Sequence, residues 1–209
     1  MKRKDFSKLK ITVQKEKDSY FEHEDYIAGV APNLRGIHST MYFQKSLETK
    51  ISINTFSKEN STPEIELSTF LAESLNAIQK GIENNNTIDA IVLELSFETK
   101  IGKNHFDEIA KMRAARMLWA KLIKQFNPKN QCSFALKINA TIDTSFNAFQ
   151  AILGGCQRIV SNDKKHLIFV EETGILKTVD PWAGSTFIEK KTEEIATKSW
   201  LLFKKISIN

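Results

Sequence analysis

The apolar residues of one stretch, residues 104–126, are spaced as in a long helix and would cover most of its circumference. Projected at about 100° per residue, Phe106 and Met117 lie on one side, and Trp119 and Ile123 lie on much of the opposite side. Only a narrow strip is polar, formed by Asp107, Lys111, Lys121 and Gln125. A helix that is apolar on several sides is covered on several sides, so we expect this one to be the central packing element.

Two arginines of this stretch fall among its apolar positions. Arg113 and Arg116 therefore need carboxylate or carbonyl partners if they are buried, and we expect them to serve structure rather than to contact a ligand. Trp119 is expected in the core or at an interface. The acidic residues considered as partners for the arginines are Glu94, Glu171 and Glu172.

The remaining apolar pattern alternates between strands and helices. Strands are predicted at 50–54, 88–97, 133–138 and 157–161, and helices at 61–81, 104–126, 143–153 and 186–206, with a short apolar run at 167–170. The nearly continuous apolar run in 88–97 predicts a strand covered on both faces. The alternation is typical of an α/β fold with about four parallel strands and crossover helices, and a complete (β/α)8 barrel needs roughly 250 residues. We therefore expect a partial TIM-like barrel.

The first 25 residues differ in composition from the rest of the chain. Residues 1–25 are highly charged and weakly periodic, which predicts an N-terminal arm, and residues 26–209 are expected to form a single domain. Gly29, Pro32 and Gly36 prevent a long helix just after the arm, so residues 26–42 are predicted to be an ordered loop.

Charge and hydropathy exclude several classes of function. The net charge of +5 comes mostly from lysines spread over the whole chain, whereas a nucleic-acid binder clusters them. No apolar run is long enough to span a bilayer, and the basic opening lacks the apolar segment of a signal peptide, so we expect a cytoplasmic protein without a membrane partner. The basic balance favours anionic ligands such as coenzyme A only by weak steering.

Cysteine and histidine spacing gives no metal site. Cys132 and Cys156 are far apart, and the four histidines form no HxxxH pair. Cys156 follows Gly155 with no adjacent histidine, so we expect it to be a small core residue and not a nucleophile.

Three segments resemble one protein family. They are residues 29–42, with Arg35-Gly36 and Thr40-Met41-Tyr42; residues 106–126; and residues 172–185, ending in Asp180-Pro181-Trp182-Ala183-Gly184-Ser185. In this order they resemble the acyl-CoA-binding barrel domain of the methylmalonyl-CoA mutase family. The resemblance covers most of the chain from residue 26 onward and corresponds to the later half of the barrel.

The resemblance implies a substrate class and a cofactor. The family rearranges the carbon skeleton of an acyl-CoA with adenosylcobalamin, and the coenzyme A tail is threaded along the barrel axis. On this basis the residues expected along the coenzyme A channel are Arg35, His38, Thr40, Met41 and Tyr42. The alternative is a packing loop that has lost its ligand. The turn through Asp180 and Trp182 is expected to be structural and to dock Trp182 into the core.

Departures from the family pattern point away from catalysis. Ser57 stands where the family has its catalytic histidine, and a serine cannot supply the imidazole that hydrogen-bonds the thioester carbonyl. His38 replaces a tyrosine, and no histidine has the DxHxxG context through which the family binds cobalamin. The resemblance thus implies a truncated, degenerate member that resembles the family's noncatalytic subunit, without a cobalamin domain. Adenosylcobalamin would be reached only through a partner.

Three functions remain open at this level. The chain is expected to be a noncatalytic accessory subunit whose open sheet edges are covered by a catalytic mutase subunit or by a second copy. One alternative is a small acyl-CoA-binding protein without catalysis. The other is an isomerase subunit that borrows cobalamin from another chain.

Overall fold

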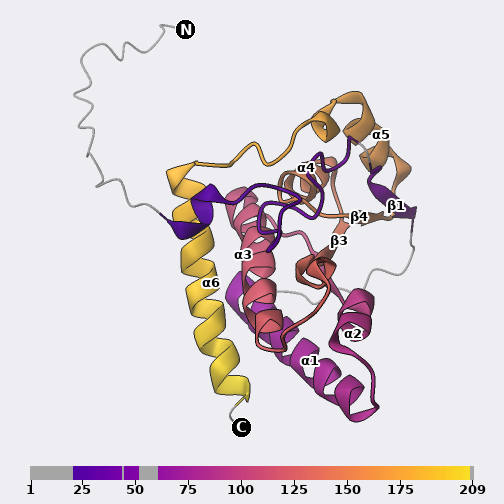
Figure 1. The fold of residues 1–209 in the computed structure, drawn as a ribbon. Helices are drawn as coiled ribbons and strands as arrows, with labels where there is room; N and C mark the ends of the chain where they lie inside the picture. The colour runs from indigo at the N-terminus through magenta and orange to yellow at the C-terminus, as the bar shows by residue number, and fades with distance from the viewer. Residues whose placement is uncertain (1–20, 44, 52–60, 208–209) are drawn as a thin grey trace, which may run out of the picture.

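The computed structural model describes residues 21–43, 45–51 and 61–207, which form one parallel sheet with a layer of helices (Figure 1). The elements are, in order, η1 (Glu22–Asp25), β1 (Glu48–Ile51), α1 (Pro63–Glu83), α2 (Ile88–Glu94), β2 (Ser96–Lys100), α3 (His105–Lys124), η2 (Gln131–Phe134), β3 (Lys137–Ile142), α4 (Ser145–Leu153), β4 (Arg158–Ser161), α5 (Lys164–Glu172), η3 (Ile175–Lys177) and α6 (Thr186–Ser207).

The sheet has four strands in the order β1-β4-β3-β2, and every neighbouring pair is parallel. The connections from β2 to β3 and from β3 to β4 run through α3 and α4, as in successive units of a (β/α) barrel. The first strand lies beside the last, which is also the pairing that closes a complete barrel. The expected α/β fold, a partial TIM-like barrel with four parallel strands, is confirmed.

One face of the sheet carries the core. Phe97, Ile138 and Ile159 point to the helices and are almost fully buried, whereas Glu98 on the opposite face is exposed. The register aligns a polar row across that opposite face, formed by Glu48, Arg158, Asn139 and Glu98. This alternation is unusual for a parallel sheet, whose strands normally bury both faces.

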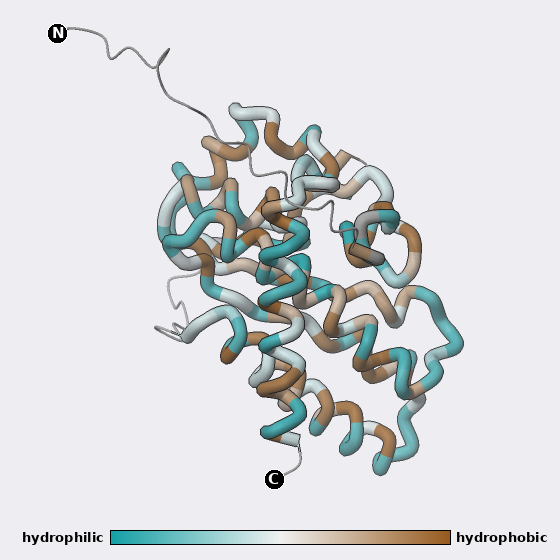
Figure 2. The backbone as a smooth tube through the Cα atoms, turned by 90° about the vertical axis from the view of Figure 1, so that its left-hand side faces the viewer, coloured by the Kyte–Doolittle hydropathy of each residue, from teal (hydrophilic) through white to brown (hydrophobic). Residues whose placement is uncertain are grey.

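Helix α3 is the central element, as its apolar pattern predicts. It contacts α1, α4 and α6, and its buried residues lie all round the helix. Asp107 and Glu108 lie at its N-terminal end, and Lys121 and Lys124 at its C-terminal end, so charges complement the helix dipole. Figure 2 shows hydrophobic and hydrophilic residues mixed along each long helix.

The predicted strand 88–97 is wrong over most of its length. Residues up to Glu94 form helix α2, and the strand begins only at Ser96. The Thr87 side chain accepts a hydrogen bond from the amide of Ala90 and caps the helix. Leu93 is 44% exposed and Val92 is buried, so the apolar run has one buried side, as in a helix, instead of two.

The predicted strand 133–138 begins too early. Ser133 belongs to the 3-10 helix η2, and β3 runs from Lys137 to Ile142. Two side-chain contacts hold the 3-10 turn: Asn130 accepts from the amide of Cys132, and the Ser133 hydroxyl donates to Asp89 at 2.6 Å. The predicted strand ends before Asn139 because this residue is polar. In the structure Asn139 belongs to β3 and lies on the sheet face away from the helices.

The other predicted elements agree with the structure within a few residues. The helices predicted at 61–81, 104–126, 143–153 and 186–206 correspond to α1, α3, α4 and α6, and the strand predicted at 157–161 corresponds to β4. The run 167–170 lies inside helix α5, whose N-terminus is capped by Asp163. Of the strand predicted at 50–54, the first two residues belong to β1 and the rest fall outside the described residues. Most of the predicted arm, residues 1–20, lies outside them as well.

Candidate functional site

The loop 26–43 lies across α3 and α4 and contains every residue predicted for the coenzyme A channel. It closes on itself through a hydrogen bond from the amide of Gly29 to the carbonyl oxygen of Gly36 at 2.9 Å. Gly29 has a φ of +77°, and a Cβ there would lie 2.3 Å from the amide nitrogen of Ser39. Only glycine fits this crossing of the loop.

Arg35 points into the protein and not into a channel. Its Nη1 lies 2.5 Å from Glu189 Oε1 and 3.1 Å from Asp180 Oδ2, and its Nη2 donates to the carbonyl oxygen of His23 at 3.1 Å. The residue is 4% exposed. It therefore joins the loop to the turn before α6 and to α6 itself.

Glu189 is the centre of this ion cluster. It is fully buried, and its Oε1 also accepts from Arg113 Nη2 at 2.6 Å and from the amide of Gly184 at 3.2 Å. Arg113 Nη1 binds Asp180 in addition. Burial alone raises the pKa of a carboxyl group, but the hydrogen bond from His23 and the charges of Arg113 and Arg35 outweigh it and lower the pKa of Glu189 to about 2.

Arg116 is buried, and among the described residues it forms no ion pair with a carboxylate. Its Nε donates to the carbonyl oxygen of Leu34 at 2.9 Å and its Nη1 to that of Gly155 at 3.4 Å. Burial and the neighbouring Arg113 lower the pKa of Arg116 to about 10, so the side chain stays charged at neutral pH. The acidic partners considered from the sequence are wrong: Arg113 uses Asp180 and Glu189, and Arg116 uses carbonyl groups.

Met41 and Tyr42 also face inward. Met41 is 3% exposed, and a Cβ at Gly36 would lie 2.5 Å from its sulfur. The Tyr42 hydroxyl donates to the carbonyl oxygen of Cys156 at 2.6 Å, and burial raises the pKa of Tyr42 well above its ordinary value. Burial likewise raises the pKa of the Cys156 thiol to about 12, so Cys156 is a core residue with no thiolate at neutral pH.

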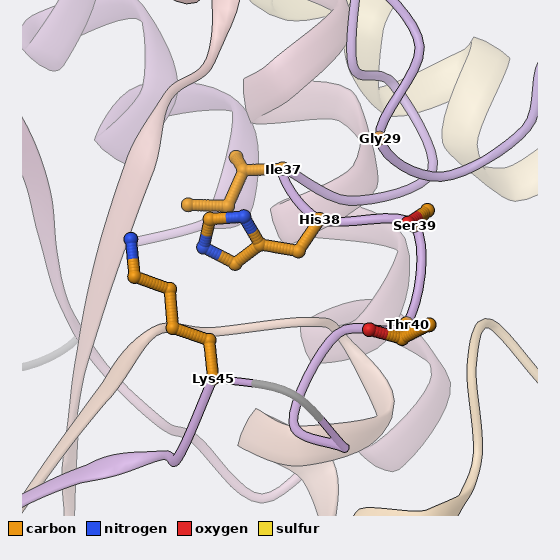
Figure 3. A pocket seen from close by; sticks show the side chains of 6 residues that line it. All are labelled: Gly29, Ile37, His38, Ser39, Thr40 and Lys45. Carbon is orange, nitrogen blue, oxygen red and sulfur yellow. The ribbon is translucent and has the colours of Figure 1, made fainter.

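The outer side of the same loop forms an open pocket of about 360 Å³. It is lined by Gly29, Ile37, His38, Ser39, Thr40 and Lys45. Figure 3 shows the His38 ring beside the Lys45 side chain, with the Thr40 hydroxyl on the same side of the loop. Of the residues predicted for the channel, the structure thus brings His38 and Thr40 together at the pocket and directs Arg35, Met41 and Tyr42 away from it.

The pocket has the chemistry of a weak anion site. Lys45 supplies a positive charge, and the Thr40 hydroxyl is buried without a hydrogen-bond partner among the described residues. Burial, assisted by Lys45, lowers the pKa of His38, so its ring is largely neutral at pH 7 and is a hydrogen-bonding group there. One lysine and one hydroxyl are enough to hold a phosphate oxygen but not to reproduce a channel.

Trp182 does not enter the core, contrary to the expectation from the sequence. It is half-buried and packs edge-on against Phe106, with ring centroids 5.6 Å apart. His105, Phe146 and Phe187 complete an aromatic cluster at the N-terminal ends of α3, α4 and α6. The core tryptophan is Trp119, which is 1% exposed and donates to the carbonyl oxygen of Ser133 at 3.1 Å.

A second buried charge cluster was not anticipated. The sequence pattern places Lys111 in the polar strip of α3, but Lys111 is 1% exposed and its Nζ lies 2.9 Å from Glu66 and 2.7 Å from Glu108. Thr99 donates to the other oxygen of Glu66 at 2.6 Å. Burial, only partly offset by Lys111, raises the pKa of Glu108. The i, i+3 spacing of Glu108 and Lys111 was the one signal in the sequence.

Three of the four histidines contact groups of their own fold. His23 faces the ion cluster, His105 packs in the aromatic cluster, and His166 bonds Ser161 at 3.0 Å. His38 remains, in the pocket, beside a lysine. No group of three metal-binding side chains occurs in the part of the chain that the structure describes, and Ser57 lies outside that part.

Comparisons with known proteins agree with the fold. The family model for methylmalonyl-CoA mutase matches residues 48–209. The large subunit of methylmalonyl-CoA mutase from Porphyromonas gingivalis is 34% identical over 177 residues, which cover 69% of this chain and 25% of that protein. The large subunit from Propionibacterium freudenreichii subsp. shermanii is 30% identical, with 84% and 29% covered. The mitochondrial enzyme of Homo sapiens is 33% identical, with 68% and 23% covered.

These matches extend over most of the chain but only part of each relative. The chain spans about a quarter of the length of these curated relatives. None of the helices in the described ranges is long and apolar enough to cross a membrane. With the family model matching well over half of its residues, the chain belongs to the methylmalonyl-CoA mutase family.

Proposed function

We propose that this chain is a noncatalytic partner subunit of an acyl-CoA mutase. The observation that carries the proposal is the direction of three loop side chains. The family resemblance assigns Arg35, Met41 and Tyr42 to the coenzyme A channel, but Arg35 binds the ion cluster, Tyr42 donates to a backbone carbonyl group and Met41 is buried. A loop that uses its ligand-facing residues to hold its own fold serves as a scaffold.

Two sequence features support the same function. By the family resemblance, Ser57 stands at the position of the catalytic histidine, and a serine does not supply the imidazole for general acid chemistry at the thioester carbonyl. In this proposal adenosylcobalamin is carried by a partner. Cys132 and Cys156 are free thiols, which suits a reducing compartment, and we place the protein in the cytoplasm.

The partner in this proposal is a catalytic mutase subunit. β1 and β2 are the edge strands of the sheet, and edges of this kind are usually covered. A second copy of the chain is the alternative occupant.

The test is a mixing experiment with a purified large mutase subunit of the same host. We expect light scattering after gel filtration to show a stable one-to-one complex, and the chain alone to show no turnover with adenosylcobalamin and methylmalonyl-CoA. Turnover by the chain alone, or two separate peaks at micromolar concentration, would contradict the proposal. Cobalamin-dependent turnover that appears only in the mixture and increases with Ser57→His would favour the isomerase alternative.

A second candidate function rests on the pocket. His38, Thr40 and Lys45 line part of a pocket of about 360 Å³. It has a positive charge and a hydroxyl with no hydrogen-bond partner among the described residues, which suits the phosphate groups of an acyl-CoA. In this function the chain binds an acyl-CoA and catalyses no reaction.

Calorimetry with coenzyme A separates the two candidates. Binding that is lost in Lys45→Glu and weakened in Thr40→Val would support the second function. Lys124→Glu, the same charge change at the exposed C-terminal end of α3, is the matched control and should bind like the wild type. Equal heats for all four proteins would remove the pocket as a site.

A further inference from the structure

The outer side of the loop brings two basic side chains together. His38 and Lys45 both line the open pocket, and Figure 3 shows the imidazole ring beside the lysine side chain. The other lining residues carry no charge: Gly29, Ile37, Ser39 and Thr40. A pocket whose lining has two basic groups and no acidic one attracts anions.

The hydroxyl of Thr40 adds a polar group to the same pocket. It is buried and has no hydrogen-bond partner in the ranges that the structure describes, which costs free energy for a hydroxyl group. An oxygen atom of an anion in the pocket is a suitable partner for it. The volume of about 360 Å³ is within the range of small-molecule pockets, so there is room for a phosphate ester as well as for a free ion.

A proton on His38 is disfavoured in the free protein. Burial of the ring, assisted by the positive charge of Lys45, lowers the pKa of His38. Two other cations belong to this region, but Arg35 binds the ion cluster and Arg116 binds the carbonyl oxygen of Leu34, both on the inner side of the loop. An anion beside the ring would reverse the local charge and favour the imidazolium, which has two N–H groups to donate. Anion and proton therefore favour each other's binding.

We propose that this pocket binds a doubly charged oxyanion together with a proton, with the anion held between Lys45 and the His38 imidazolium and by the Thr40 hydroxyl. Two positive charges balance two negative ones, so a phosphate ester or a free phosphate matches the site better than a single carboxylate does. The site presupposes the anion-binding pocket of the second candidate function and adds a pH dependence to it. It is independent of whether the chain is a partner subunit.

The affinity for the anion is highest where His38 is already protonated. Below the lowered pKa of the free ring the anion meets two positive charges, and above the pKa of the ring in the complex it meets only Lys45. Because the coupling between the two binding events is reciprocal, we expect binding to be about tenfold tighter at about pH 5 than at about pH 8.

Nuclear magnetic resonance of the histidine rings measures this coupling. Sulfate is the probe, because it stays doubly charged over this pH range, and sodium chloride at the same ionic strength is the reference. The His38 signal, identified by its loss in His38→Gln, should titrate at higher pH in sulfate than in chloride. His166, whose Nδ1 lies 3.0 Å from the Ser161 hydroxyl, is the internal control and should titrate alike in both salts.

Three variants separate the contributions of the pocket. Lys45→Gln should raise the pKa of His38 in chloride, because the repelling charge is gone, and sulfate should then change that pKa less. Thr40→Val should weaken sulfate binding about threefold and retain its pH dependence. His38→Gln should bind sulfate equally well at both pH values, as followed by the amide signal of Gly29.

Inorganic phosphate and coenzyme A distinguish the two sources of the anion. A change at His38 with coenzyme A alone would assign the site to the ester, and a change with both would show that it also takes the free ion. If the pocket amide signals move with sulfate but the titration of His38 does not, proton coupling is overturned and the pocket remains an anion site. If these signals move with none of the three anions, the pocket is not an anion site, and the second candidate function fails with it.

Discussion

The pKa values of two buried glutamates, one on α6 and one on α3, are shifted in opposite directions. Glu189 of α6 is fully buried and its pKa is lowered to about 2, whereas Glu108 of α3 is 7% exposed and its pKa is raised. Burial raises the pKa of both. The difference lies in the cations around them.

Two arginines form ion pairs with Glu189, whereas Glu108 and Glu66 form ion pairs with the same lysine. The guanidinium groups bind the Glu189 and Asp180 carboxylates in a planar, multiply hydrogen-bonded arrangement, which favours the ionised form. Lys111 is a single point charge between two carboxylates, so one negative charge is left uncompensated. The ionised carboxylate is therefore favoured where buried cations match the carboxylates in number, as at Glu189 and Asp180, and not where two carboxylates share one lysine.

The largest expected effect comes from breaking the balanced cluster. Glu189→Gln leaves Arg35 and Arg113 buried with too little negative charge, and removal of one partner from such a pair costs about 3–5 kcal/mol. Urea unfolding monitored by circular dichroism should show this loss of free energy of unfolding at pH 7. Glu194→Gln on the exposed side of α6 is the control and should change stability by less than about 0.5 kcal/mol. A cost below about 1 kcal/mol for Glu189→Gln would mean that the cluster is not a major source of stability.

The pH dependence sharpens the contrast. A carboxyl group has a pKa of about 4.3 in the unfolded chain, so the stability that Glu189 provides is complete above that pH and is lost as pH falls toward 2. For Glu108 the sign is reversed, because a raised folded pKa means that stability is lost as pH rises through it. Relative to the wild type, Glu189→Gln should therefore recover stability on acidification, and Glu108→Gln should gain relative stability on going from about pH 4 to pH 7. Slopes of the same sign would contradict the difference.

The fold was largely predictable because it depends on periodic burial. The pattern of residues 104–126 predicts a helix covered on several sides, and α3 is one. Errors arose where local hydrogen bonds competed with the apolar pattern. The Thr87 cap turned an apolar run into α2, and the contact of Ser133 with Asp89 delayed the start of β3.

For the candidate site, the sequence predicts which residues belong to the loop but not the direction in which their side chains point. The resemblance selects Arg35 and Tyr42, but nothing in the sequence says whether a long side chain faces a ligand or its own fold. That direction is decided by partners distant in the chain, such as Glu189 for Arg35. The burial of Lys111 was hidden for the same reason, because Glu66 on α1 provides its second carboxylate.

A smaller effect is expected from the neutral contact that fixes the end of the loop. Tyr42→Phe removes the hydroxyl that donates to the carbonyl oxygen of Cys156 at 2.6 Å, and the free energy of unfolding should fall by about 1 kcal/mol. Thermal unfolding checks this, with Tyr26→Phe as the control. If Tyr42→Phe equals the control, the hydroxyl is exchanged for water at no cost, and the loop is held by the ion cluster alone.

The smallest effect should come from the unbalanced cluster. Glu108→Gln removes the uncompensated negative charge and retains a hydrogen-bonding side chain of the same shape, so it should cost less than about 1 kcal/mol at pH 7. The same substitution at Glu189 is expected to cost several times more, although Glu189 and Glu108 are both buried. Parallel urea titrations, with the exposed Glu94→Gln as the control, measure the ratio. Equal costs at the two positions would show that burial, and not the number of cations around each carboxylate, determines what a buried glutamate contributes to this protein.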